Sequence, residues 1–228
     1  MRTLWRSLVA GYLRLIEPII AWCVRHQVSP NLITSVGTAS ACAVGVCYAF
    51  GWFVAGGWTL GILAFFDVVD GAVARRSGRA TVFGSFYDAT LDRVADAFLF
   101  GGFVMFYAMH DVPRQATMVL IALVALVATQ LTSYTRSRAE LIGVDMKGVG
   151  WMERPERITL LAAPQAFFGR AFDGWVVDAV VTLLAVTAVV TVAQRIRHVL
   201  RATSVAIFPV IEGPGPRPGT AHDEERPR

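Results

Sequence analysis

Six stretches of apolar residues, each long enough to cross the roughly 30 Å hydrocarbon core of a bilayer, limit what this chain can fold into. The residues are 55% hydrophobic, and the remaining charge is gathered in short blocks instead of being spread as on a soluble surface. The sequence therefore predicts an all-α integral membrane protein with six transmembrane helices. The expected spans are residues 32–50, 53–74, 83–109, 117–133, 158–172 and 175–192.

The first thirty or so residues form a leader that is too long and too charged for the front of a secretory signal peptide. Its apolar residues recur at helical spacing opposite Arg14 and Glu17, which predicts an amphipathic helix on the membrane surface; packing on other protein is the alternative. These apolar residues are Trp5, Leu8, Val9, Tyr12, Ile16, Ile19, Ile20 and Cys23. We expect a juxtamembrane helix over 1–30, one membrane domain over 31–205 and a disordered cytoplasmic tail over 206–228, where Pro, Gly and charge are frequent.

Basic residues predict the orientation in the membrane. The Lys and Arg residues lie in the leader, in the turn 75–79, in the loop 136–157 and from Arg195 onward, and both termini are therefore predicted to be cytoplasmic. The exceptions are Arg93, Arg114 and Arg170. A net charge of +4 suits anionic lipid headgroups. Nucleic acid is not an expected partner, because no soluble basic domain is present to bind it.

Four carboxylates at two helix ends carry the strongest chemical signal: Asp67 and Asp70 end the second span, and Asp88 and Asp92 begin the third. Aspartates near a membrane are costly unless compensated. Spacings of three and four place each pair on one face of its helix, and the short turn between the helices predicts that the four groups converge. Clustered carboxylates select hard cations such as Mg²⁺ or Mn²⁺, and two ions suit phosphoryl chemistry.

Small residues share these helix faces. Gly71, Ala74 and Gly84 lie one helical turn from the aspartates, where they either leave room for a ligand or allow close helix packing. Arg75 follows Ala74 and is placed to bind a phosphate. Asp96 continues the four-residue ladder after Asp92. We expect Asp96 to pair with Arg93 or with a neighbouring helix.

Together these residues form one pattern: Asp67-Val-Val-Asp70-Gly71-Ala-Val-Ala74-Arg75, eight residues, then Gly84-Ser-Phe-Tyr-Asp88-Ala-Thr-Leu-Asp92. It resembles, position for position, the signature of the CDP-alcohol phosphatidyltransferases. The resemblance implies an enzyme of a bacterial cell membrane, forming a homodimer, that joins the phosphatidyl group of CDP-diacylglycerol to an alcohol. It also implies that Asp67, Asp70, Asp88 and Asp92 hold two Mg²⁺ or Mn²⁺ ions. Asp92 is further expected to accept the proton of the alcohol.

Residues at the start of the first span resemble the family's Pro-Asn segment, which contributes to the CDP site. Without the resemblance, Asn31 reads equally well as a helix cap. The expected CDP-lipid contacts are Pro30, Asn31, Leu32, Ile33, Gly71, Ala74, Arg75, Thr81 and Gly84.

A second basic group lies at later helix ends on the same predicted side of the membrane, where positive-inside loops alone would also place arginines. The segments 130–140 and 153–157 resemble those of bacterial phosphatidylinositol-phosphate synthases, in which basic residues bind the phosphate of the acceptor. The resemblance implies a phosphorylated polyol acceptor, inositol phosphate in the first place and glycerol 3-phosphate as the alternative. The expected acceptor contacts are Ser133, Arg136, Arg138, Arg154, Arg157 and Arg195.

Two other classes of protein place aspartates in membrane helices. A transporter with an intramembrane cation site would carry them near the midplane, in duplicated halves or broken helices that this sequence lacks. A membrane prenyltransferase would be longer and would carry two separate Asp motifs. No histidine lies at helical spacing from the aspartates, and the three cysteines are expected to be small core residues.

Overall fold

In the computed structural model the chain is a bundle of helices; residues 16–63, 66–152 and 154–204 are described, with 66–68 and 154 described by their backbone alone. These residues contain no strand. The leader is helical over 16–25. The later elements are α2 (Pro30–Ala49), α3 (Phe53–Leu63), α4 (Phe66–Arg76), α5 (Val82–Met109), α6 (Gln115–Leu141), α7 (Arg154–Phe168), the short 3₁₀ turn η1 (Phe172–Gly174) and α8 (Trp175–Thr203). The fold is all-α, as predicted.

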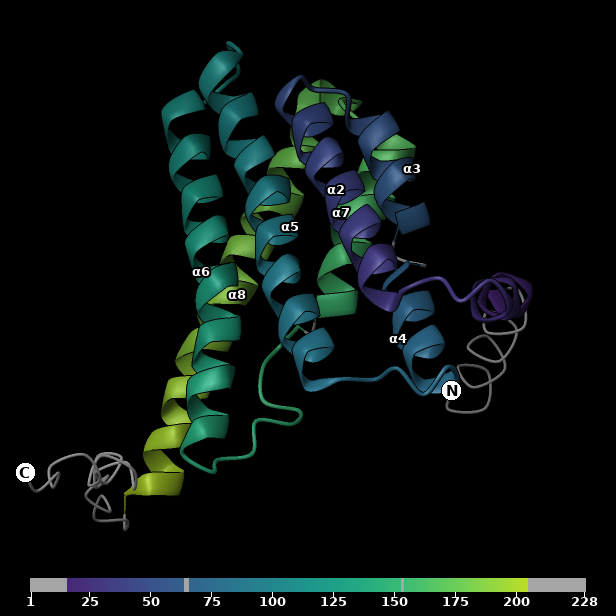
Figure 1. Cartoon of the computed structure of the whole chain (residues 1–228). Helices are drawn as coiled ribbons and strands as arrows, with labels where there is room; N and C mark the ends of the chain where they lie inside the picture. Colours follow the sequence, from purple (N-terminus) through teal and green to yellow (C-terminus); the bar gives the residue numbers. More distant parts are fainter. Residues whose placement is uncertain (1–15, 64–65, 153, 205–228) are drawn as a thin grey trace, which may run out of the picture.

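The long helices run side by side, with α5 near the centre of the bundle (Figure 1). Helix α5 packs against α2 on one side and α6 on the other, while α6 packs against α8 and α3 against α7. Aromatic side chains fill the core between them, and the hydroxyl of Tyr48 donates a hydrogen bond of 3.0 Å to the carbonyl oxygen of Leu161. Helices α2 and α5 lie so close that a Cβ atom on Gly45 or Gly102 would clash with backbone of the other helix. This contact fixes how far α5 can slide along α2.

Within the described residues, three helices are long and apolar enough to cross a membrane: Pro30–Ala49, Gln115–Leu141 and Phe172–Thr203. The other expected spans are helical but fall short of these requirements. The second is divided into α3 and α4, with residues 64 and 65 outside the described part, and α7 has 15 residues. Helix α5 carries four charged residues: Asp88, Asp92, Arg93 and Asp96. Six crossings therefore stay a prediction.

The leader helix lies beside α4. Its residues Ile16, Ile20 and Cys23 are buried with Val69 and Val73 of α4. The described half of the leader thus packs on α4 through these residues, and its place on the membrane surface stays a prediction. Its neighbours Ile19 and Trp22 are exposed. Residues 1–15 and the expected tail lie outside the described residues.

The three cysteines are free thiols. Cys23 is a buried core residue, as expected, whereas Cys42 and Cys47 are half-buried.

Candidate active site

The two halves of the aspartate pattern are joined by a short turn after α4. Thr81 caps α5, because its hydroxyl oxygen accepts the backbone N–H of Gly84 at 2.9 Å. Helix α2 packs against both α4 and α5, and the two helices of the pattern lie on either side of the start of α2 (Figure 1). The start of α2 therefore completes the site between them.

A small cavity of about 220 Å³ opens where α2 and α5 begin and α4 ends. All of the expected CDP-lipid contacts except Leu32 and Ile33 line it, together with Asp70 and Asp88. Leu32 is exposed, and Ile33 is buried against Val69 and Val73. The N-cap of α2 is Ser29, so the reading of Asn31 as that cap is wrong. Asn31 lies instead in the cavity wall.

The small residues of the pattern leave space inside this cavity. A Cβ atom on Gly71 would meet the guanidinium of Arg75 at 3.2 Å, and one on Gly84 would meet Thr81 at 3.1 Å and Asn31 at 3.5 Å. Neither position touches the backbone of another helix, unlike Gly45 and Gly102. The geometry favours room for a ligand over close helix packing.

Asp70 is anchored to a neighbouring helix. Its side chain is buried, accepts a hydrogen bond of 2.8 Å from the hydroxyl of Thr34, and also accepts the backbone N–H of Gly71. These contacts tie the carboxylate to α2. Asp88 is exposed and lines the same small cavity, whereas Asp92, one turn later, is half-buried and lines a second cavity.

The side chain of Asp67 lies outside the described residues. Among the side chains that are described, no three His, Cys, Asp or Glu groups gather closely enough to hold a metal ion. The convergence of four carboxylates therefore stays a prediction. The donor set fits a hard cation, since Asp70, Asp88 and Asp92 offer only carboxylate oxygens and no cysteine or histidine lines either cavity.

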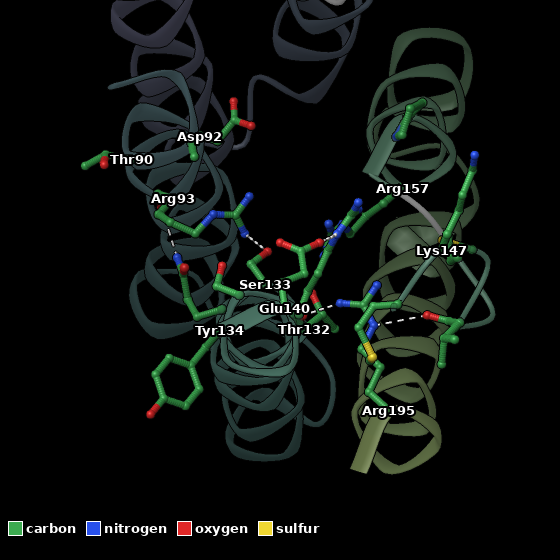
Figure 2. Close-up of a pocket in the computed structure, with 18 of the residues that line it drawn as sticks. Thr90, Asp92, Arg93, Thr132, Ser133, Tyr134, Glu140, Lys147, Arg157 and Arg195 are labelled. Atoms are coloured by element: carbon green, nitrogen blue, oxygen red, sulfur yellow. Dashed lines mark hydrogen bonds and ion pairs between the residues drawn. The ribbon is translucent and has the colours of Figure 1, made fainter. Parts of the chain in front are cut away.

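The second cavity is larger, about 1010 Å³. Its walls are α5, α6, the segment that follows α6, the start of α7 and the last turns of α8. Four of the expected acceptor contacts line it: Ser133, Arg136, Arg157 and Arg195. Figure 2 shows Arg93 and Asp92 on one side of this cavity and Arg157 and Arg195 on the other. Arg138 is exposed and lines neither cavity, and the side chain of Arg154 lies outside the described residues.

These arginines also bind protein groups, and Arg157 donates a hydrogen bond of 3.5 Å to the hydroxyl of Thr132. Arg195 is buried and donates to the carbonyl oxygen of Thr132 and, at 3.1 Å, to that of Val149. It thereby fastens the segment after α6 to the cavity. Arg136 pairs with Glu140 at 2.9 Å, and both side chains are more than half exposed. The larger cavity is accordingly a basic pocket with one firmly held wall.

Sequence reasoning missed several residues of this cavity, among them Arg93, Gln130 and Lys147. Arg93 offered a signal, because it is a charge inside a predicted membrane span, directly after Asp92. The expected pairing of Asp96 is confirmed: its carboxylate lies 3.1 Å from a terminal nitrogen of Arg93.

Comparison with known proteins decides the family. The family model described as CDP-alcohol phosphatidyltransferase matches residues 27–193, which include both cavities' aspartates and most of the bundle. The chain belongs to the CDP-alcohol phosphatidyltransferase family. It is therefore an enzyme, and the transporter and prenyltransferase readings are set aside. With its three apolar helices, it is an integral membrane protein.

Several curated relatives are named phosphatidylinositol phosphate synthase. The chain is 34% identical over 197 residues to a phosphatidylinositol phosphate synthase of Mycobacteroides abscessus, covering 86% of this chain and 88% of that protein. It is also 34% identical over 203 residues to the Streptomyces avermitilis protein of the same name, covering 86% and 82% respectively.

Solved structures agree with this similarity. The phosphatidylinositol phosphate synthase of Mycobacterium tuberculosis with CDP-DAG bound superposes with a TM-score of 0.74 at 33% identity, covering 82% of this chain and 94% of that one. A structure of the same enzyme with manganese and citrate gives a TM-score of 0.72 at 34% identity, covering 80% and 87%.

Proposed function

We propose that this enzyme transfers the phosphatidyl group of CDP-diacylglycerol to a hydroxyl of inositol phosphate, giving phosphatidylinositol phosphate and CMP. The observation that carries the proposal is the placement of Asp88 and Asp92. These residues are one turn apart on α5, and they line the small and the large cavity respectively. A donor in one cavity and an acceptor in the other would meet along this face of α5.

The small cavity suits the CDP end of the donor. Arg75 and Arg79 line it and offer guanidinium groups to a diphosphate, and Gly71 and Gly84 leave space for it. Asp67, Asp70, Asp88 and Asp92 would hold two divalent ions, Mg²⁺ or Mn²⁺, and a solved relative contains manganese. When bound, such ions supply charge neutralisation at the diphosphate and make CMP a better leaving group.

Asp92 is assigned the proton transfer. The acceptor hydroxyl oxygen attacks the lipid-linked phosphorus, the bond from that phosphorus to the CMP oxygen breaks, and the hydroxyl proton passes to the Asp92 carboxylate. The transfer is a single displacement, because no Ser, Cys or His is assigned as a covalent nucleophile.

The large cavity suits an acceptor that is itself anionic. Arg93, Arg136, Arg157, Lys147 and Arg195 line it, against the carboxylates of Asp92 and Glu140. A phosphate suits this group of cationic side chains better than a neutral alcohol does, because it brings negative charge among them. Inositol phosphate is chosen over glycerol phosphate because the relatives named above are phosphatidylinositol phosphate synthases. Arg138 and Arg154 remain proposed contacts on the same ground.

The membrane arrangement is part of the proposal. Six helical crossings would place both termini in the bacterial cytoplasm, with the leader helix at the membrane surface and residues 206–228 as a cytoplasmic tail. The two cavities would then open toward the cytoplasmic leaflet, where both substrates are accessible. Two chains would form a homodimer, as the family resemblance implies.

Release of CMP by the purified enzyme tests the proposal. With CDP-diacylglycerol and Mg²⁺ or Mn²⁺, we expect CMP release to depend on inositol phosphate and to be much slower with free inositol, which lacks the phosphate. A rate with glycerol 3-phosphate that exceeds the rate with inositol phosphate would show that the acceptor assignment is wrong. Failure with every phosphorylated alcohol would overturn the proposed function.

A further inference from the structure

Arg93 connects α5, which carries Asp92, to α6, which carries Ser133. Its side chain reaches from α5 and donates a hydrogen bond to the hydroxyl of Ser133 on α6 (Figure 2). We propose that Arg93, held in place by Asp96, is a positioning residue that turns the Ser133 hydroxyl toward the phosphorylated acceptor. The inference rests on the proposed function, since it concerns the acceptor side of the same site.

Asp96 fixes the direction of the Arg93 side chain. The Asp96 side chain is fully buried, and within the described part of the chain neither carboxylate oxygen accepts a hydrogen bond. The guanidinium of Arg93, 3.1 Å away, compensates its charge. A buried carboxylate without a counter-charge is strongly destabilising, so Arg93 is held beside Asp96.

The backbone of Arg93 is held as well. The side-chain amide of Gln130 on α6 donates a hydrogen bond of 3.0 Å to the carbonyl oxygen of Arg93. Gln130 and Ser133 are three residues apart and share one face of α6. Arg93 is therefore attached to α6 at two points, and the height of α5 against α6 is set at the level of the larger cavity.

The chemistry of the Arg93–Ser133 contact determines what Ser133 can do. A guanidinium has only donors, so the Ser133 oxygen must accept, and the single hydroxyl proton is left to donate elsewhere. Both residues line the larger cavity, where Arg157 and Arg195 face them. An acceptor phosphate or hydroxyl oxygen in the cavity takes that proton as a hydrogen bond. Without Arg93 the hydroxyl is free to rotate, and the α6 backbone competes for its proton.

A purely structural ion pair would behave differently from a positioning pair. Loss of a structural pair lowers the yield of folded enzyme and affects both substrates. Loss of a positioning pair raises the KM for the acceptor and leaves the KM for CDP-diacylglycerol unchanged, because Arg93 and Ser133 do not line the smaller cavity. The two roles are therefore separable by steady-state kinetics.

The test compares full-length variants with the acceptor that gives the fastest CMP release. Arg93→Met and Ser133→Ala should each raise the acceptor KM roughly 10-fold, and the double variant no further, since both remove one interaction. Arg93→Lys, which keeps a donor and the charge, should recover part of the loss. Arg197→Met, an exposed arginine on α8 outside both cavities, is the matched control and should leave both KM values unchanged.

Arg93→Met leaves Asp96 buried without its partner, so Arg93→Met combined with Asp96→Leu provides a second route. Removing both charges of a buried pair is often tolerated, and this variant should fold yet keep the raised acceptor KM. The inference is overturned if the KM increases of Arg93→Met and Ser133→Ala multiply in the double variant. It is also overturned if the KM for the acceptor and the KM for CDP-diacylglycerol rise equally. The wild-type rate tests the proposed function and the ratio of variant to wild-type KM tests Arg93, so the two can fail separately.

Discussion

At the scale of single residues, the site divides its arginines between two cavities. Arg75 lines the smaller cavity beside Gly71, while Arg195 lines the larger one and fastens its wall through Thr132 and Val149. If the smaller cavity holds the CDP-lipid and the larger one the acceptor, each arginine serves one substrate.

This division predicts a crossed pattern of kinetic effects. Arg75→Gln should raise the KM for CDP-diacylglycerol roughly 10-fold or more, because a charged hydrogen bond to the diphosphate is lost, and should change the acceptor KM little. Arg195→Gln should raise the KM for the acceptor and change the KM for CDP-diacylglycerol little. The measurement is KM for each substrate at saturating levels of the other. Parallel effects of both variants on both substrates would show that the cavities do not hold separate substrates.

The residue scale is also where sequence reasoning succeeded and failed most clearly. The fixed spacing of the aspartate pattern predicted six residues of the smaller cavity, because residues one turn apart on a helix stay together in any fold. The family resemblance added Pro30, Asn31 and Thr81. Asn31 was open to reading as a cap because caps depend on where a helix begins, and α2 begins two residues earlier than that reading requires. Arg93 was missed because its role depends on Ser133, forty residues away on another helix.

At the scale of elements, α4 packs on the leader helix with one face and lines the smaller cavity with another. Val69 and Val73 face the leader helix, while Asp70, Gly71 and Ala74 line the smaller cavity. Arg76 extends the first face, because its guanidinium donates two hydrogen bonds to the carboxylate of Glu17. The leader helix therefore supports the helix that carries half of the aspartate pattern.

This support predicts a charge-dependent effect on donor binding. Arg76→Glu places two negative charges together and should raise the KM for CDP-diacylglycerol by a small factor, about fivefold at most, since the pair is exposed. Glu17→Arg in the same chain should restore it. If the KM for CDP-diacylglycerol does not recover in the double variant, the pair between Arg76 and Glu17 does not support donor binding.

The pH dependence of this contact has a definite sign. The hydrogen bonds from Arg76 hold the pKa of Glu17 below its ordinary value of 4.5. A depressed carboxyl pKa favours the docked form above the ordinary value, and that advantage is lost as the pH falls through the lowered pKa. The contact should accordingly be unchanged between pH 6 and 8.

At the scale of the whole molecule, both cavities share one end of the bundle. Both cavities lie at the end where α2 and α5 begin and α6 ends, and the connection from α5 to α6, which carries Asp111 and Arg114, lies at the other (Figure 1). Apolar length predicted where the helices lie. Six crossings stay a prediction, because the helices that build the site contain charges or breaks.

The orientation predicted from the basic residues is testable by cysteine labelling in a background without Cys23, Cys42 and Cys47. Asp111→Cys should react with an impermeant maleimide in intact cells. Leu141→Cys, exposed at the other end of α6, should react only after the membrane is permeabilised. The reverse pattern would invert the topology and place both cavities outside the cytoplasm.

The central claim is that Asp92, in the wall of the larger cavity, takes the acceptor proton as the phosphatidyl group is transferred. Its most direct test is the single-turnover rate of CMP release from enzyme already loaded with CDP-diacylglycerol, started by adding inositol phosphate. Asp92→Asn should bind the CDP-lipid but release CMP at a rate that is lower by roughly 100-fold or more. Asp111→Asn, at the opposite end of the bundle, should match the wild-type rate. A wild-type rate from Asp92→Asn would contradict the account.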